Sequence, residues 1–142
     1  MTAEEKYKHW HKLAQYDLES ADAMFSTGRW FYVVFMCQQA IEKLCKGLYT
    51  LYLDDDVPKI HNIKHIFLCF EEKLPVTAGE DKYYLFDSLS AHYLLSRYPD
   101  FSSQPGQQID KSEAEQLLVK TKEVFSWLLT LKPSRELPGT MQ

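Results

Sequence analysis

The sequence predicts an all-α protein, an antiparallel up-and-down four-helix bundle with one additional short helix. Gly47 aside, the five glycines and six prolines all fall between long stretches that contain neither residue. Such spacing is typical of helices and differs from strands that recur every 8–12 residues. Within the stretches, apolar residues recur every three or four positions, as one face of a helix requires. A length of 142 residues with 45% apolar content is sufficient for one core.

The first two helices are expected at residues 3–26 and 30–53. Thr2 and Glu5 fit a capping box, in which the side chain of each residue accepts a hydrogen bond from the backbone N–H of the other. Gly28 is placed to end the first helix, and the short joint makes the pair an antiparallel hairpin. The apolar stripe of the first helix consists of Tyr7, Trp10, Ala14, Leu18, Ala21 and Phe25.

The second helix begins with an apolar run from Trp30 to Cys37 that covers nearly every face. A helix of this kind lies at the centre of a bundle or at an oligomer interface. Further along, a polar stripe lies opposite the apolar positions and consists of Gln39, Glu42, Lys43 and Lys46.

A shorter helix is expected at residues 63–73, with Asn62 as its cap. Another is expected at residues 81–97, because Pro99 pushes the preceding residue out of helical geometry. Its apolar positions include Tyr84, Leu85, Leu89 and His92.

The last helix is expected at residues 111–131, capped by Asp110 with Glu113 at the third position. The polar residues from Pro133 onward resemble a flexible tail. The chain is therefore expected to form one domain, residues 1–132, followed by a tail at residues 133–142.

Charge and cysteine content exclude several classes of protein. A net charge of −4 argues against a protein that coats nucleic acid through bulk charge, although a local basic pocket is compatible with it. No apolar run approaches the ~20 residues of a membrane span, and the acidic N-terminus is unlike a secretory signal. Cys37 and Cys45 are about 12 Å apart along one helix, too far for a disulfide, and Cys69 is the third cysteine. These features indicate a reduced, cytoplasmic protein.

Motifs for common cofactors are absent from the sequence, and no cofactor is expected. His61 and His65 have the spacing of paired zinc ligands, but Lys64 stands where the general base would be, and no third ligand is evident. His61 is therefore interpreted as a helix-entry residue that makes a local hydrogen bond, and no metal site is predicted. Neither phosphate-loop motif nor a nucleophile-elbow motif occurs.

Two groups of residues are candidates for binding. The stripe with Lys43 and Lys46 is either a cationic surface or a solvated face with a Glu42–Lys46 pair of a few tenths of a kcal/mol. The run Arg97-Tyr98-Pro99-Asp100 is either a helix stop or a site where arginine binds phosphate and tyrosine stacks on a base.

At these residues the sequence resembles the HEPN family of small helical bundles. The matching segments are residues 14–21 in the first helix, 38–48 in the second, 60–63 at the third and 97–100 after the fourth, and the resemblance spans roughly residues 8–130. It implies a bundle that commonly forms homodimers and is linked with nucleotide or RNA binding. Some members are ribonucleases, often toxins, and others pair with small nucleotidyltransferases in toxin–antitoxin-like operons.

The sequence departs from the ribonuclease members, whose arginine is followed four to six residues later by histidine. After Arg97 the corresponding positions are Ser102, Ser103 and Gln104, so no group is placed to exchange a proton with a ribose 2′-hydroxyl.

We therefore expect a HEPN-like nucleotide- or RNA-binding module without strong catalysis. One alternative is a protein-interaction module that pairs with itself or with a nucleotidyltransferase, and another is a metal-independent ribonuclease. In the expected site, the cationic side chains of Lys43, Lys46 and Arg97 contact phosphate. The ring of Tyr98 stacks, and His61 and Asp100 orient the other groups by hydrogen bonds.

Overall fold

The computed structural model describes residues 1–97 and 109–133, and over these residues all regular structure is helical. The predicted all-helical class is therefore confirmed. The elements are α1 (Ala3–Ser26), α2 (Trp30–Leu53), α3 (Ile63–Leu68), a 3₁₀ turn η1 (Glu71–Lys73), α4 (Glu80–Arg97) and α5 (Lys111–Leu129).

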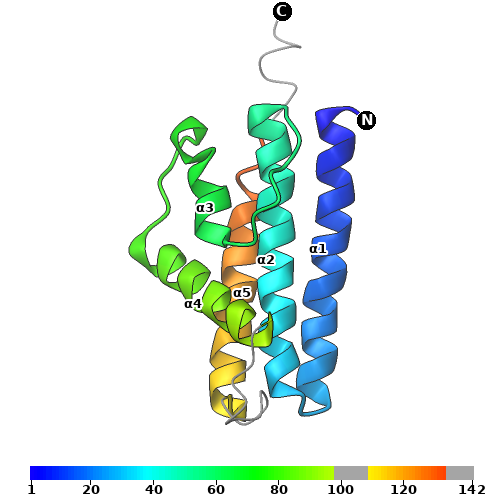
Figure 1. Ribbon diagram of the computed structural model, residues 1–142, viewed down its shortest axis with the longest axis vertical. Helices are drawn as coiled ribbons and strands as arrows, with labels where there is room; N and C mark the ends of the chain where they lie inside the picture. Colours follow the sequence, from blue (N-terminus) through cyan, green and yellow to red (C-terminus); the bar gives the residue numbers. More distant parts are fainter. Residues whose placement is uncertain (98–108, 134–142) are drawn as a thin grey trace, which may run out of the picture.

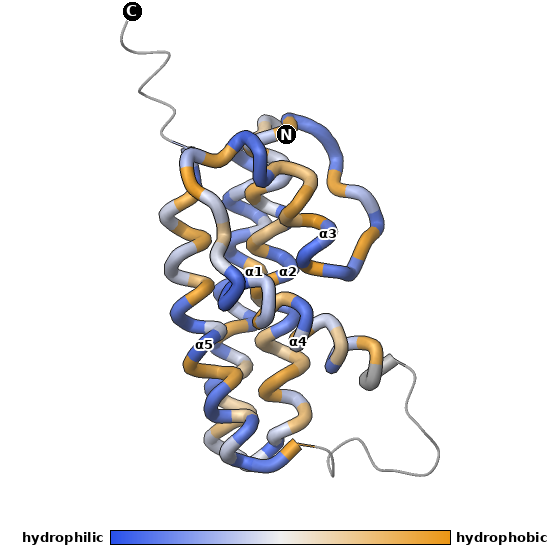
Figure 2. Tube along the Cα trace, turned by 90° about the vertical axis from the view of Figure 1, so that its left-hand side faces the viewer, coloured by the Kyte–Doolittle hydropathy of each residue, from blue (hydrophilic) through white to orange (hydrophobic). Residues whose placement is uncertain are grey.

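Helix α2 is the central element of the bundle. Helices α1, α2 and α5 lie side by side along the long axis, and α4 runs obliquely in front of α5 until its C-terminal end reaches α2 (Figure 1). The chain runs down α1, up α2, obliquely down α4 and up α5, with α3 beside α2. Apolar and polar segments alternate along the long helices (Figure 2), as expected where each helix buries one face.

Local sequence signals determine the helix ends. The Thr2 hydroxyl accepts the Glu5 N–H at 3.1 Å and the Glu5 carboxylate accepts the Thr2 N–H at 2.8 Å, which completes the predicted capping box. Gly28 has φ +74°, and the Gly28 and Arg29 N–H groups donate to carbonyls of the last turn of α1. The predicted caps Asn62 and Asp110 likewise accept backbone N–H groups of α3 and α5.

Gly47 lies at a close approach of α1 and α2. A Cβ atom at this position would lie 3.1 Å from Trp10 Cβ and 3.2 Å from Tyr7 Cδ1. Gly47 is the glycine that lies inside a predicted helix, and packing explains its presence there, because any side chain at this position would press against α1.

Two predicted elements differ from the structure in extent. The helix expected at residues 63–73 is α-helical only to Leu68, because the Cys69 and Phe70 N–H groups bond three residues back and tighten the chain. The helix expected to end at residue 131 ends at Leu129.

The predicted apolar stripe of α4 is wrong at Tyr84. This side chain is 74% exposed, whereas Phe86 and Leu89 are fully buried. The buried positions of α4 still recur every three or four residues, at Leu85, Phe86, Leu89, Ser90 and Tyr93, and Tyr84 lies outside this stripe.

Residues 134–142 of the expected tail lie outside the described residues, as do Tyr98 and Asp100 of the candidate site. None of the described helices has both the length and the apolar content that a membrane crossing demands.

Candidate functional site

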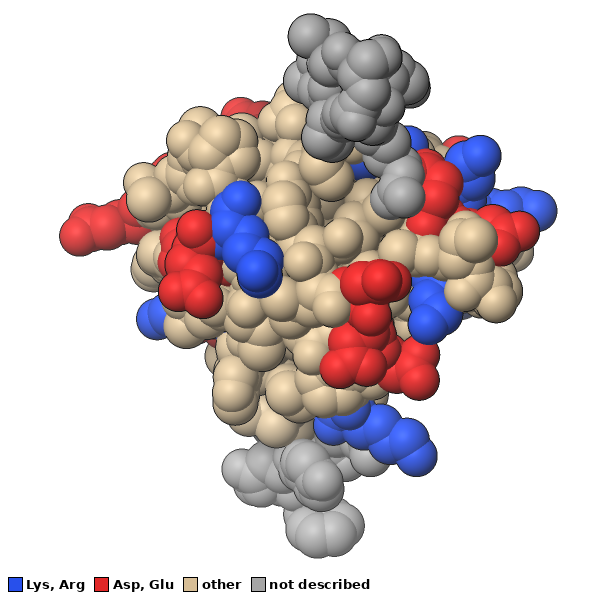
Figure 3. Space-filling model, turned by 90° about the horizontal axis from the view of Figure 1, so that it is seen from above, with Lys and Arg blue, Asp and Glu red and all other residues tan. Residues whose placement is uncertain are grey.

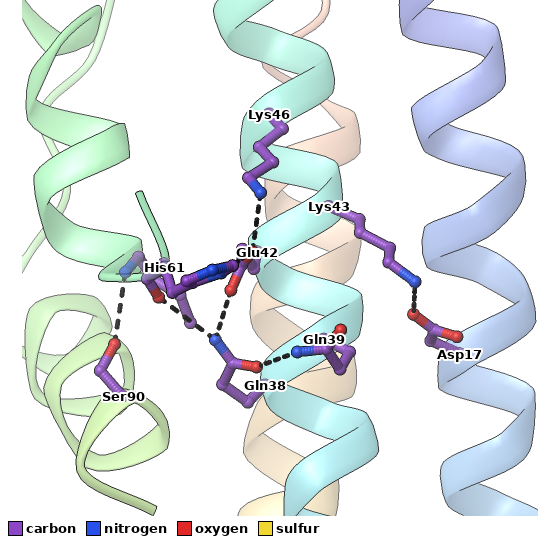
Figure 4. A network of polar contacts seen from close by, with 9 residues as sticks. Asp17, Gln38, Gln39, Glu42, Lys43, Lys46, His61 and Ser90 are labelled. Carbon is purple, nitrogen blue, oxygen red and sulfur yellow. Dashed lines mark hydrogen bonds and ion pairs between the residues drawn. The ribbon is translucent and has the colours of Figure 1, made fainter. Parts of the chain in front are cut away.

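A buried carboxylate organises the polar face of α2. Glu42 is only 4% exposed, and its Oε1 atom accepts a hydrogen bond from Gln38 Nε2 at 2.7 Å. Its Oε2 atom lies 2.8 Å from Lys46 Nζ and 3.1 Å from His61 Nδ1 (Figure 4). Three nitrogen donors thus surround one carboxylate, which satisfies a group that is costly to bury alone.

The connector between α2 and α3 covers this face, and two hydrogen bonds fasten it there. Gln38 is fully buried, and its Nε2 atom also donates to the His61 carbonyl at 3.3 Å. The Ile63 N–H donates to Ser90 Oγ of α4 at 3.3 Å (Figure 4). The backbone on both sides of Asn62 is therefore tied to α2 and α4, which positions the imidazole of His61 over Glu42.

Aromatic rings link this cluster to the C-terminal half of α4. The His61 and Tyr93 rings are 5.2 Å apart, and Tyr93 in turn stacks on Phe35 of α2 with a centroid distance of 6.3 Å. Tyr93 lies one helical turn before Arg97, the last residue of α4. The contact of α4 with the His61 imidazole therefore lies one helical turn before the last residue of this helix.

The two lysines of the predicted cationic stripe have different surroundings. Lys46 points to Glu42, and its Nζ atom also lies 5.5 Å from the centre of the Trp10 ring. Lys43 extends to α1 and pairs with Asp17 at 2.6 Å (Figure 4). The predicted Glu42–Lys46 pair is present, but the expected solvated face is wrong, since Glu42 is buried under the connector.

Of the six predicted site residues, Lys46 and His61 are brought together at Glu42. Lys43 lies on the neighbouring face of α2, turned to α1. Arg97 ends α4, and Tyr98 and Asp100 fall outside the described residues.

Four residues with polar or aromatic contacts here were not predicted from the sequence: Gln38, Ser90 and Tyr93 at this cluster, and Asp17, the partner of Lys43. A signal existed for two of them. Asp17 falls between Ala14 and Ala21 on the apolar stripe of α1, and Gln38 directly follows the apolar run of α2. A polar side chain on a buried face needs a partner, so each position indicates a buried polar contact.

The buried thiols of Cys37 and Cys45 in α2 have low reactivity. Burial, and then the charge of Glu42, raise the pKa of Cys45 far above its usual range, and burial raises the pKa of Cys37 to about 12. Both remain protonated near neutral pH and are poor nucleophiles or metal ligands. Over residues 1–97 and 109–133, no three His, Cys, Asp or Glu side chains are grouped as metal ligands.

Charges of both signs are mixed on the surface seen in Figure 3, where basic and acidic side chains lie next to each other. No broad positive patch is seen on this face among the described residues, and the net charge of the chain is −4, so we expect an anion to be bound by particular groups.

Comparison with known proteins identifies the family. The HEPN domain model matches residues 7–132. The fold is similar to the crystal structure of TT1696 from Thermus thermophilus, with a TM-score of 0.76 and 23% identity over 88% of this chain and 97% of that chain. It is also similar to ST0689, an archaeal HEPN homologue, with a TM-score of 0.72 and 24% identity over 90% of this chain and 98% of that chain. No curated protein matches the chain. Since the domain model runs from the first turns of α1 past the end of α5, this chain belongs to the HEPN family.

Proposed function

We propose that this HEPN protein binds a nucleotide or RNA at the surface where α2, the α2–α3 connector and the end of α4 meet. We call this surface the connector site and define it by Gln38, Glu42, Lys46, His61 and Arg97. The convergence of Lys46 and His61 on the Glu42 carboxylate carries the proposal, because residues from two separate segments supply nitrogen donors at one place.

In this proposal the cationic groups at the connector site contact phosphate oxygens. Charged N–H donors form the stronger hydrogen bonds to phosphate, and an arginine adds two parallel bonds. Tyr98 and Asp100 follow Arg97 directly in the sequence and are proposed to stack on a base and to orient the neighbouring donors. Lys43 is proposed to meet phosphate at the edge of the site.

The ion pairs limit how strong this binding is. Lys43 and Lys46 are already balanced by Asp17 and Glu42, so a phosphate must share these lysines with carboxylates. We therefore expect a weak dependence on salt. Two or three phosphate contacts on a single strand correspond to a slope of log affinity against log salt of about −1.4 to −2.1.

Calorimetric titration of nucleotides and a short single-stranded RNA tests the proposal. The wild type is compared with a Lys46→Met, Arg97→Ala double variant, and Lys122→Met is the matched control. Lys122 also belongs to an ion pair, with Asp22 at 2.7 Å, but it joins α5 to α1. We expect the double variant to lose at least tenfold in affinity and the control to match the wild type.

Equal binding by the wild type and the double variant, or no binding by either, would overturn the proposal.

The same RNA is analysed on a gel after incubation with the protein. Cleavage would assign a ribonuclease activity instead of binding alone.

A second function is favoured by the exposed apolar surface at the start of α2. In the run from Trp30 to Met36, only Val33 and Val34 are buried, and Tyr32 is 52% exposed. Leu94 of α4, next to the Phe35–Tyr93 stack, is 57% exposed. Aromatic residues are enriched at protein interfaces. We propose that this surface pairs with a second copy of the chain or with a nucleotidyltransferase.

Sedimentation equilibrium tests self-association through this surface. We expect a wild-type dimer that Tyr32→Ser and Leu94→Ser weaken. The matched control is Tyr84→Ser, which removes an exposed aromatic ring, 74% exposed, from the other half of α4. A monomer at all concentrations that also captures no purified nucleotidyltransferase would contradict this second proposal.

A further inference from the structure

The imidazole of His61 is held with one nitrogen inward and one outward. Nδ1 faces the buried Glu42 carboxylate, while the side chain as a whole is 51% exposed. Within the described part of the chain, Nε2 has no hydrogen-bond partner. The Tyr93 ring against one side of the imidazole and the fastened backbone at His61 restrict its rotation. The outward Nε2 atom is therefore a fixed contact point for a ligand.

Among the residues whose side chains the structure describes, the charges around this imidazole balance without it. On α2, Glu42 carries one negative charge and Lys46, 2.8 Å away, carries one positive charge. From α4 the facing titratable group is Tyr93, and between α3 and α4 Lys64 and Asp87 pair at 3.6 Å. A neutral His61 leaves this group of residues with no net charge, and a protonated His61 leaves it with one positive charge.

Protonation also reverses the hydrogen-bonding character of Nε2. When Nδ1–H donates to Glu42 in the neutral ring, Nε2 presents a lone pair, which repels a phosphate oxygen. In the protonated ring both nitrogens donate, so Nε2–H forms a charge-assisted bond to phosphate while Nδ1–H keeps its bond to Glu42. The neutral and protonated forms therefore differ strongly in how they receive an anion.

We propose that a phosphodiester anion binds at His61 Nε2 with uptake of one proton by the imidazole, and that Glu42 is the buried counter-charge. This inference rests on the proposed function, because it concerns the same connector site and names a positive charge that this site gains in addition to that of Arg97. The proton comes from solvent, and no covalent bond forms or breaks.

Glu42 acts here as a positioning residue. Its carboxylate holds the proton-bearing Nδ1 and turns Nε2 outward, while Lys46 offsets its negative charge so that the anion is not repelled. The lysine thus supports binding mainly by neutralising the carboxylate, and His61 supplies the charge that the ligand meets.

The test uses a short oligouridylate without terminal phosphates, because its phosphodiesters keep a constant charge between about pH 5.5 and 8, where imidazoles titrate. Calorimetry is repeated across this range and in buffers of different ionisation enthalpy. We expect wild-type affinity to fall by up to about tenfold per pH unit toward alkaline pH, with about one proton taken up per ligand at the alkaline end.

Two variants at His61 and one matched control assign the effect. His61→Gln and His61→Asn cannot titrate, and since the side chain is half exposed, both are expected to fold as the wild type does, as circular dichroism will check. We expect their affinity to be independent of pH and close to that of the wild type at alkaline pH. His65→Gln removes an exposed histidine one turn away and is expected to keep the full pH dependence.

The outcomes separate the two proposals. Wild-type binding that is independent of pH, or a pH dependence that survives in both His61 variants, would overturn the proton uptake and leave the proposed function standing. Absence of oligouridylate binding at every pH would overturn the inference, and absence of nucleotide binding as well would overturn the proposed function. Loss of the pH dependence in His65→Gln would show that His65, and not His61, takes up the proton, and this would overturn the inference.

Discussion

The Glu42–Lys46 ion pair is expected to stabilise the fold far more than a surface pair of the same geometry. Its N–O distance is 2.8 Å and its side chains are 5% and 12% exposed, whereas the Asp22–Lys122 pair at 2.7 Å has side chains 50% and 48% exposed. At these distances the gross attraction is about 6 kcal/mol at an effective dielectric of 20 and about 1.5 kcal/mol in water. After desolvation and lost side-chain freedom, we expect coupling free energies of about 2–3 kcal/mol for the buried pair and below about 1 kcal/mol for the exposed pair.

Double-mutant cycles in urea unfolding measure both quantities. One cycle combines Glu42→Gln with Lys46→Met, and the matched cycle combines Asp22→Asn with Lys122→Met. Both cycles are measured at the same pH and salt concentration. A coupling free energy at Glu42–Lys46 as small as that at Asp22–Lys122 would refute the reasoning, because burial would then have no effect on the pair.

Three other predictions concern the fold. Gly47→Leu is expected to lower the free energy of unfolding by roughly 1–3 kcal/mol through overpacking against α1, and an unchanged urea midpoint would contradict the close approach of the helices. Asp110→Ala should cost about 1 kcal/mol, because its side chain accepts the Glu113 N–H at 2.8 Å; thermal unfolding measures this. A thiol reagent near pH 8 should modify only the exposed Cys69 in the folded protein. Burial raises the pKa of Cys37 to about 12 and that of Cys45 further, so neither forms the reactive thiolate. Rapid modification of either buried thiol, detected by mass spectrometry, would disprove this.

Helix positions could be predicted because their signals are local. The Thr2–Glu5 capping box, Gly28 and the caps Asn62 and Asp110 each act within a few residues of a helix end, and all four are present in the structure. The exposure of Tyr84 could not be predicted in this way, because Tyr84 and Phe86 both flank Leu85 in the sequence, and which of the two rings is buried depends on the face that α4 turns to the packed bundle.

The candidate site could be predicted in part for the same reason. The pairing of Glu42 with Lys46 follows from their separation of four residues on one helix. The meeting of His61 with Glu42 does not, because it depends on how the connector folds back over α2. Contacts between residues far apart in sequence, Gln38 with the His61 carbonyl and Ser90 with the Ile63 N–H, hold it there.

Backbone amide chemical shifts during titration with the oligouridylate test the connector site most directly. We predict that the shifts change in three segments that are separate in sequence, around Gln38–Lys46 of α2, around His61, and in the last turns of α4. Unchanged shifts in these segments, or changes confined to the outer face of α1, would contradict the account.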